Sequence, residues 1–417
     1  MSAAAACAGA SGLPLEAALD RLRAAARVAV GTETVPLERA RGRFLAATVT
    51  PRDDVPSGDR VAVDGWAFAW SEAIGSRGAE LATVGGIAAA GAPLAVPVPA
   101  GCAARVLTGA LPPEGTDTIA PDEACGRETP GRVALPAGLA RGANRRHTGE
   151  DLRAGAAVLQ AGERIDARHL AVLAACGRAA VTVHAPLPVA LASSGDELVP
   201  VEAAPGPAGT RDVNRPMLRG LLEGLGASVV DLGVIDDRPE RVAGLLDRAA
   251  SAAPVVLLSG GAAGSEADHA AGRIEAAGSW LVRRVAVKPG APFSVARLGD
   301  TLVVLLPGNP AAAFVTFLRL ARPLLVAMAG GRWPVPRAWP VRAGFSLDKK
   351  PGRTECLRAT VADHSDPLPV ATPVARQSSA VVSSLLEADG LLELEHDRTS
   401  VRDGEVLRFF PFAELLG

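Results

Sequence analysis

The chain has 417 residues, of which 48% are hydrophobic and 21% charged, and its formal net charge is −2. This length is too great for one ordinary hydrophobic core and predicts about three or four domains. The nearly balanced charge argues against broad binding to nucleic acid or to a membrane surface.

The cysteines and the N-terminus bear on where the protein works. The five cysteines are scattered, without a CxxC pair or metal-ligand spacing, which favours reduced thiols in the cytoplasm. Residues 1–12 are rich in alanine but have no basic n-region, so we expect a disordered tail rather than a signal peptide. No continuous apolar run reaches the roughly 18 residues of a membrane span.

The first 185 residues predict a helix and then mostly loops and short strands. Residues 15–28 form an amphipathic pattern with Leu15, Leu19 and Leu22 on one stripe, which is typical of a helix. A polar loop over 52–68 leads into a strand. Short strands separated by Gly/Pro turns follow from about Leu81 to Val133 and predict a small all-β unit.

From Pro186 the pattern changes to alternating strands and helices. Strands are expected at 189–192 and 228–234, with helices that start after Asp212 and after Asp237. With a last helix over 311–329, this pattern predicts one α/β domain. Beyond Trp333, short strands punctuated by proline predict a small β-barrel or sandwich.

Three apolar runs in this α/β region each end in a Gly/Pro loop. The loops are Ser259-Gly260-Gly261, Lys288-Pro289-Gly290 and Pro307-Gly308-Asn309-Pro310. In an open parallel sheet such loops meet at the carboxyl ends of the strands, where ligands bind. Backbone N–H groups exposed by glycine and followed by a helix N-terminus can hold phosphate.

Lysine is rare in this chain, because only Lys288, Lys349 and Lys350 are lysine among 43 basic residues. Lys288 stands on one of the loops at the predicted site. A compact ammonium is well suited to offsetting phosphate charge, and we favour that role over an ordinary surface position.

Eight motifs appear in one order along the chain: Pro56-Ser57 through Asp64-Gly65, Thr108-Gly109-Ala110, Arg146 with Gly149-Glu150-Asp151, Gly195-Asp196-Glu197-Leu198, Asp212-Val213-Asn214, Ser259-Gly260-Gly261 with Glu266-Ala267-Asp268, Lys288-Pro289-Gly290 and Pro307-Gly308-Asn309-Pro310. In this order they resemble the molybdopterin molybdenumtransferase family, which includes bacterial MoeA and the E domain of gephyrin. The resemblance begins near Leu15 and covers nearly the whole chain.

The resemblance implies a multidomain fold of α/β plus β class. It contains a discontinuous N-terminal domain (14–52 and 143–185), an inserted small β domain (53–142), a doubly wound α/β molybdopterin-binding domain (186–330) and a C-terminal β-barrel (331–417). It also implies a homodimer in which the α/β domain of one subunit and the first two domains of the other form each site. The molybdopterin adenylyltransferase and recipient molybdoenzymes are expected partners.

The implied reaction is the magnesium-dependent insertion of molybdate into adenylylated molybdopterin, with release of AMP. By the resemblance, the catalytic residues are Asp64, Asp151, Lys288 and Arg284, and the magnesium ligands are Glu197, Asp237 and Asp268. The substrate-binding residues are Thr108, Arg146, Ser194, Gly195, Asp212, Asn214, Ser259, Gly260, Gly261, Pro307, Asn309, Arg358 and Ser379. Carboxylates suit this role because magnesium prefers hard oxygen ligands.

Several of these residues have a simpler structural explanation. Asp237 stands at a helix start and is equally explained as an N-cap. Asp268 also fits a cap, but Glu266 beside it favours a cluster of carboxylates. Asp64 before Gly65 is compatible with a plain turn. Asp212 and Asn214 are expected first as helix-start residues and second as substrate contacts. The loop histidines, His147 and His269, lack metal-ligand spacing.

The chain also departs from the family pattern. Ala263 and Ala291 replace a serine and a lysine that are usual in the family, and Arg284 stands where many relatives have lysine. The departures keep open a non-catalytic paralogue that binds molybdopterin or molybdenum cofactor as a carrier or scaffold. A third class, the adenylyltransferases and related nucleotide hydrolases, shares only the α/β domain.

Overall fold

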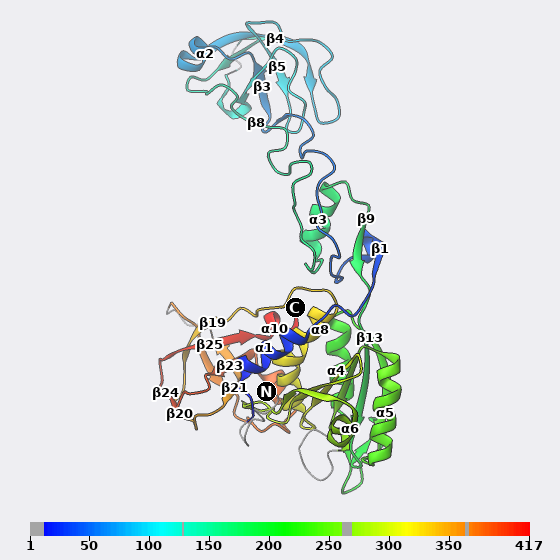
Figure 1. Ribbon diagram of the computed structural model, residues 1–417. Coiled ribbons are helices and arrows are strands. Elements are labelled where there is room, and N and C mark those ends of the chain that lie inside the picture. The colour runs from blue at the N-terminus through cyan, green and yellow to red at the C-terminus, as the bar shows by residue number, and fades with distance from the viewer. Residues whose placement is uncertain (1–11, 127–128, 261–268, 363–366) are drawn as a thin grey trace, which may run out of the picture.

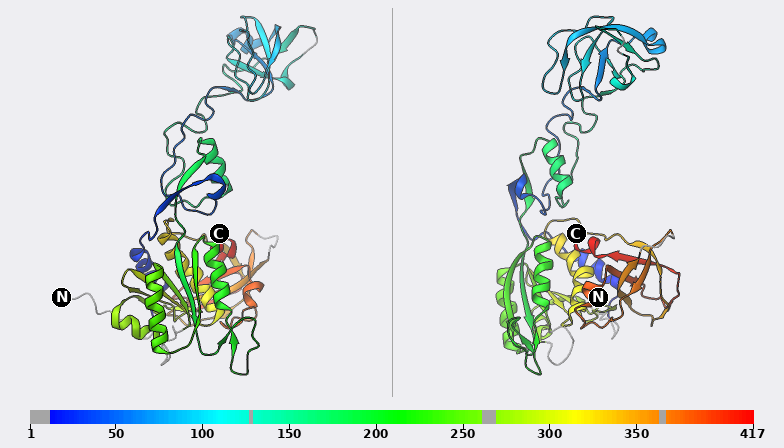
Figure 2. Two further views of the ribbon diagram at one scale, coloured as in Figure 1. Left: turned by 90° about the vertical axis from the view of Figure 1, so that its right-hand side faces the viewer. Right: turned by 180° about the vertical axis from the view of Figure 1, so that it is seen from behind.

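A computed structural model describes residues 12–126, 129–260, 269–362 and 367–417. The molecule is long and has three levels (Figure 1). A small β domain lies at one end, a narrow domain with α3 lies in the middle, and the α/β domain and a barrel lie side by side at the other end. The turned views in Figure 2 show the same separation.

The α/β domain is built on a six-stranded sheet in the order β13-β10-β14-β18-β17-β15. The strands are β10 (Pro188–Ser194), β13 (Ser228–Ile235), β14 (Val255–Ser259), β15 (Ser279–Arg283), β17 (Ser294–Leu298) and β18 (Thr301–Leu306). The first four in this order are parallel, and β17 and β15 form an antiparallel edge. The continuous apolar runs fit this place, because β14 and β18 are buried along their whole length.

Helices cover both faces of this sheet, which confirms the predicted doubly wound domain. Leu218 and Leu222 of α4 (Asn214–Gly224) pack on one face with the helical run that follows β18. Leu245 and Leu246 of α5 (Pro239–Ala252) pack on the other face with α6 (His269–Ala277). The two apolar faces therefore have separate cores.

The helical run after β18 is the buried centre of the domain. It consists of α7 (Pro310–Thr316), a π-helical turn at Phe317–Ala321 and α8 (Arg322–Met328). Its 19 residues are long and apolar enough to cross a membrane, but 94% of its apolar window is buried inside the molecule. A buried helix in the core of a protein can have the same length and apolar composition. In this structure the run is such a core helix.

The first helix packs onto the α/β domain. α1 (Leu15–Ala25) buries Leu15, Ala18 and Leu22 in the same core as α4 and α8. Its apolar stripe thus covers part of the α/β domain, although the helix belongs to the N-terminal stretch 14–52. The backbone N–H of Ala286 donates to the carbonyl of Leu13 (2.6 Å) beside it.

The middle domain combines two distant stretches of chain. β1 (Thr32–Pro36) pairs with β9 (Ala180–His184), and a short 3₁₀ turn (Leu37–Arg39) and α3 (Ala167–Ala175) complete the domain. Val35, Leu45, Ile165, Leu173 and Val183 form its core.

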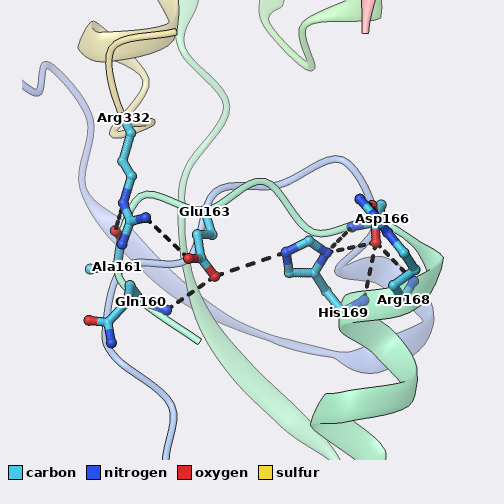
Figure 3. A network of polar contacts seen from close by, with 7 residues as sticks. All are labelled: Gln160, Ala161, Glu163, Asp166, Arg168, His169 and Arg332. Carbon is cyan, nitrogen blue, oxygen red and sulfur yellow. Dashed lines mark hydrogen bonds and ion pairs between the residues drawn. The ribbon is translucent and has the colours of Figure 1, made fainter. Parts of the chain in front are cut away.

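A polar network ties this domain to the segment that follows α8 (Figure 3). Arg332 contacts the Glu163 carboxylate (3.1 Å), and the other Glu163 oxygen lies 4.0 Å from His169 Nε2. Asp166 caps α3 and accepts from Arg168, which holds the pKa of Asp166 well below its usual range.

The distal domain is a five-stranded sheet in the order β6-β3-β5-β4-β7. Its elements are β3 (Gly65–Phe68), α2 (Glu72–Arg77), β4 (Ala79–Ala88), β5 (Cys102–Val106), β6 (Thr118–Pro121), a 3₁₀ turn (Asp122–Ala124) and β7 (Arg132–Leu135). At its base β2 (Arg60–Val61) pairs with β8 (Arg145–Arg146). The predicted small β unit is therefore present and starts earlier than Leu81.

The C-terminal domain is a closed five-stranded barrel in the order β21-β22-β19-β25-β23, with β23 returning to β21. The strands are β19 (Trp339–Ala343), β21 (Thr354–Ala362), β22 (Val370–Pro373), β23 (Gly390–Leu394) and β25 (Val406–Pro411), and β20 (Leu347–Asp348), β24 (Ser400–Val401), α9 (Ser384–Glu387) and α10 (Phe412–Leu416) complete it. One strand of the α/β region, β16 (Val287–Lys288), pairs in parallel with the start of β21. The loop that carries Lys288 is thereby attached to the barrel.

Candidate active site

A cavity of about 1140 Å³ lies where the parallel strands end and the α/β domain meets the barrel. Its walls include the loops after β10, β14 and β18, the Lys288 loop and a barrel loop, as expected for an open α/β sheet. The predicted site residues that line it are Ser194, Glu197, Asp212, Asn214, Asp237, Ser259, Gly260, Lys288, Pro307, Asn309 and Ser379.

Two predicted magnesium ligands, Glu197 and Asp237, line the cavity. The hydroxyl of Ser194 donates to Asp237, and the backbone N–H of Asp237 donates to Asp196 (2.9 Å). α5 has no side-chain N-cap bond, so the alternative that Asp237 caps this helix is wrong. The carboxylate instead joins the ends of β10 and β13.

The Glu197 carboxylate lies against Gly195. A Cβ at Gly195 would lie 2.6 Å from this carboxylate, so a side chain there would require the Glu197 side chain to shift. The segment beyond is held by the short parallel pair β11 (Leu198–Val199) and β12 (Thr210–Arg211). Gly195 itself does not line the cavity.

The described residues contain no cluster of three His, Cys, Asp or Glu side chains placed to hold a metal. Asp268, the third predicted ligand, and Gly261, a predicted substrate contact, lie outside the described residues. Glu197 and Asp237 still fit a magnesium ion, because magnesium is commonly held by one or two carboxylates together with water and substrate phosphate.

Asn214 fixes two of the glycine loops. Its side-chain amide donates to Ser259 Oγ (2.8 Å) and to the carbonyl of Gly308 (2.7 Å). Gly260 follows with φ +93°, and a Cβ there would lie 2.2 Å from the carbonyl of Ser194. The ends of β10, β14 and β18 are thus locked together at the floor of the cavity.

Asp212 stands at the start of a helix, which is the first of the two roles expected for it. It is 1% exposed and accepts from the backbone N–H (3.1 Å) and Nε (3.0 Å) of Arg215. Arg215 also contacts Asp231 (2.7 Å). Asp212 lines the cavity, but its oxygens are used to begin α4.

Lys288 and its loop also line the cavity. The Lys288 side chain is 53% exposed, and its Nζ lies 3.3 Å from Glu355, whose side chain is only 4% exposed. Arg284, predicted to assist it, does not line the cavity and lies in the turn before β16 with φ +63°. Its placement there does not support a direct role.

The barrel supplies a wall that sequence reasoning largely missed. Arg353, Gln377 and Ser378 line the cavity with the predicted Ser379. Arg358, predicted to bind substrate, is fully buried behind this loop and donates to the carbonyls of Arg376 (3.0 Å) and Ser378 (3.1 Å). Burial lowers its pKa. Arg358 thus supports the loop and does not line the cavity.

The remaining predicted residues form a second group in the middle and distal domains. Asp64 accepts from the backbone N–H and the hydroxyl of Thr108, both at 2.7 Å, and these bonds lower the pKa of its carboxyl. Arg146 pairs with Glu150 (2.5 Å), and Asp151 is exposed beside them. These loops lie near the domain with β3 and β8, far from the cavity (Figure 1).

Comparison with known families covers all four domains. Residues 13–177 match the family model described as the MoeA N-terminal region (domain I and II), and residues 190–327 match a probable molybdopterin binding domain. Residues 340–412 match the MoeA C-terminal region (domain IV).

Full-length relatives agree with these matches. The molybdopterin molybdenumtransferase of Haemophilus influenzae is 32% identical over 387 residues, covering 93% of this chain and 95% of the relative. Molybdopterin molybdenumtransferase 1 of Mycobacterium tuberculosis is 29% identical over 92% of this chain and 95% of the relative. The crystal structure of the molybdopterin biosynthesis moeA protein from Pyrococcus horikoshii superposes with a TM-score of 0.79 at 26% identity, covering 96% of this chain and 99% of that one.

The fold, the cavity and these matches define a multidomain enzyme of molybdenum cofactor biosynthesis. The chain belongs to the molybdopterin molybdenumtransferase family, and the resemblance seen in its motifs is confirmed. It is a transferase, and the non-catalytic carrier is not favoured. Matches in the N-terminal and barrel domains also argue against an enzyme that has only the α/β domain.

Proposed function

We propose that this chain inserts molybdenum into adenylylated molybdopterin with release of AMP. The observation that carries the proposal is the cavity that Glu197, Asp237 and the Lys288 loop line together. The printed names of the relatives, molybdopterin molybdenumtransferase, support the same reaction.

The residues of the cavity suit the cleavage of a phosphoanhydride. When the P–O bond breaks, negative charge develops on the departing phosphate, and Lys288 can offset it. The loop Pro307–Pro310 leads into the N-terminus of α7, an end of a helix that favours anions. Glu197 and Asp237 would hold magnesium, which supplies further neutralisation of phosphate charge when bound.

We further propose that the working molecule is a cytoplasmic homodimer. Within one chain, the middle domain separates the small β domain, which carries Asp64 and Thr108, from the α/β domain and the barrel (Figure 2). A partner subunit could bring its own copies of these residues to the cavity. An adenylyltransferase would supply the substrate, and molybdoenzymes would receive the product. Nucleic acid and membrane play no part in the proposal.

Release of AMP tests the proposal directly. Purified protein is incubated with adenylylated molybdopterin, molybdate and magnesium, and AMP is measured against time. Removing one cation from a phosphate site costs about 2–4 kcal/mol, so Lys288→Ala should slow release at least about tenfold.

Lys350→Ala is the matched control, because Lys350 is exposed and does not line the cavity. It should release AMP at the wild-type rate. A wild type that releases no AMP, or a Lys288→Ala variant as fast as Lys350→Ala, would contradict the proposed chemistry.

A further inference from the structure

We propose that Arg164 and Arg332 are positioning residues, which together prevent the middle domain from turning on the α/β domain. The distal domain with Asp64 projects from the middle domain (Figure 1), so the same contacts set where Asp64 stands. The inference rests on the proposed function, in which the distal domain of one subunit serves the cavity of its partner.

Phe44 is an apolar contact between the middle domain and the α/β domain. It lies next to Leu45 of the middle-domain core, yet it is 7% exposed and buried in the core that holds α4 and α8. The segment after α8 passes close to its ring, because a Cβ at Gly331 would lie 2.6 Å from it. Apolar contact is non-directional, so Phe44 attaches the middle domain without fixing its rotation.

Arg164 attaches the middle domain to the end of α4. Its Nη2 donates to the carbonyl of Gly224 (2.6 Å), which is the last residue of that helix. Its Nε donates to the carbonyl of Gly42 (3.3 Å) inside the middle domain. The last carbonyls of a helix lack partners within it and form the negative end of its dipole, so a guanidinium is favoured there.

Arg332, in the segment after α8, makes the second polar contact (Figure 3). Its Nη1 lies 3.1 Å from the Glu163 carboxylate, and its Nε donates to the carbonyl of Ala161 (3.2 Å). Its backbone N–H donates to the carbonyl of Gly162 (3.0 Å). Glu163 is held in turn by the backbone N–H of Gln160 (3.2 Å). Residues 161–163 of the middle domain thus contact one arginine, at a different helix from the one that Arg164 contacts.

Both helices that end at these contacts begin at the cavity. α4 begins with Asn214, which lines the cavity, and its last residue, Gly224, accepts from Arg164. The run from α7 to α8 begins at Pro310, which also lines the cavity, and Arg332 follows its end. Two helices therefore place the middle domain relative to the cavity. A rotation at these ends moves the distal domain further than the middle domain, because the distal domain lies farther out (Figure 2).

The polar contact of Arg332 is weak by itself. The side chains of Arg332 and Glu163 are 56% and 27% exposed, and ion pairs at such exposure add little to stability. With one of the two polar contacts removed, the other still opposes rotation about Phe44. The loss of both should leave the fold intact and the direction of the distal domain undefined.

Solution X-ray scattering and steady-state AMP release by the full chain test the inference. Arg164→Gln and Arg332→Gln alone should each leave the scattering curve and kcat close to those of wild type. The double variant should no longer scatter as one rigid shape. Its kcat should fall at least about tenfold, since small misplacements far from the chemistry have large effects on rate. Its KM should change little, because the residues of the cavity are unaltered.

Arg219→Gln combined with Arg402→Gln is the matched control. The side chains of Arg219 and Arg402 are 53% and 64% exposed, and each pairs within its own domain, with Glu223 and Asp348 respectively. This control removes two exposed charges without touching a contact between domains. It should scatter and react like wild type.

A double lysine variant separates the two contacts from a general loss of packing. In Arg164→Lys with Arg332→Lys, the ammonium groups keep donors for the carbonyl of Gly224 and for Glu163. This variant should therefore keep the scattering curve of wild type and most of its kcat.

The inference is overturned if the double glutamine variant scatters and reacts like its control, or if its scattering changes while kcat does not. It is also overturned if that variant fails to fold, which would assign both arginines to stability alone, or if the lysine variant recovers nothing. Failure of the proposed function gives a different result. In that case wild type would release no AMP, and the scattering of the double glutamine variant against its control would still decide whether the two arginines hold the middle domain.

Discussion

At the scale of single residues, the structure gives a reason for two of the three lysines in this arginine-rich chain. Lys349 places one ammonium among four backbone carbonyls, an arrangement that suits a compact charge with three rotatable donors. Lys288 shares a buried carboxylate with Arg353. A planar guanidinium would not reproduce the contacts of Lys349, which explains why arginine does not replace lysine there.

Cys356 gives a prediction at the same scale. It lies in the cavity wall but is fully buried, and burial raises the pKa of its thiol from 9.0 to about 12. Because the thiolate is the reactive form, Cys356 should resist a thiol reagent at pH 8 and at pH 10. Cys356→Ala should leave the number of thiols labelled in the native protein unchanged and remove one from the number labelled after unfolding.

The raised pKa of Cys356 also determines how the free energy of unfolding changes with pH. The folded-state pKa is raised, so the contribution of the protonated thiol is fully present below pH 9 and is lost as the pH rises toward about 12. Wild type should therefore lose more stability than Cys356→Ala over this range. Rapid native labelling of Cys356 at pH 8 would contradict the burial argument.

At the scale of elements, the two hydrogen bonds by which the Asn214 side chain holds the glycine loops can be tested. Asn214→Asp keeps the size of the side chain but removes both donors to Ser259 and Gly308. Leaving these buried acceptors unpaired should cost about 2–4 kcal/mol of unfolding free energy. The glycine loops should also loosen, which would lower the rate of AMP release.

Denaturant unfolding and AMP release measure the two effects of Asn214→Asp. Glu223→Gln is the control, because it alters an exposed residue near the other end of the same helix. It should change the unfolding free energy and the rate little. An Asn214→Asp variant with wild-type stability would show that these two bonds do not hold the loops.

The sequence predicts those parts of the fold that depend on local sequence patterns. Buried runs such as those of β14 and β18 fix the strands, and the glycines after them fix the edge at which the cavity forms. The packing partner of α1 is not a local property, because an apolar stripe fits any apolar face. The sequence therefore does not reveal that this N-terminal helix packs on the α/β domain.

The same difference between local patterns and tertiary packing applies to the residues of the site. Residues at strand ends, such as Ser194 and Asp237, were predicted to belong to it and line the cavity. Arg284 and Arg358 match the family pattern, but the exposure and direction of a side chain depend on tertiary packing, and neither residue lines the cavity. The wall contributed by Arg353 depends on the pairing of β16 with β21, which no spacing in the sequence reveals.

At the scale of the whole molecule, the long shape divides the predicted residues into two groups. Asp237 lies in the cavity, and Asp64 lies next to β3 at the distal end (Figure 1). If each site combines the cavity of one subunit with the distal domain of its partner, Asp64→Asn and Asp237→Asn should each abolish AMP release as homodimers. Light scattering should give twice the mass of one chain for wild type and for both variants.

Heterodimers of these two variants decide how the site is assembled. In a shared arrangement, one site of the heterodimer carries both substitutions and the other carries neither, so heterodimers purified through two different tags should regain about half of the wild-type activity. If each site were built within one chain, both sites of the heterodimer would carry a substitution and activity would stay absent. The mixed dimer thus distinguishes a site shared across two subunits from a site that a single chain closes by bending.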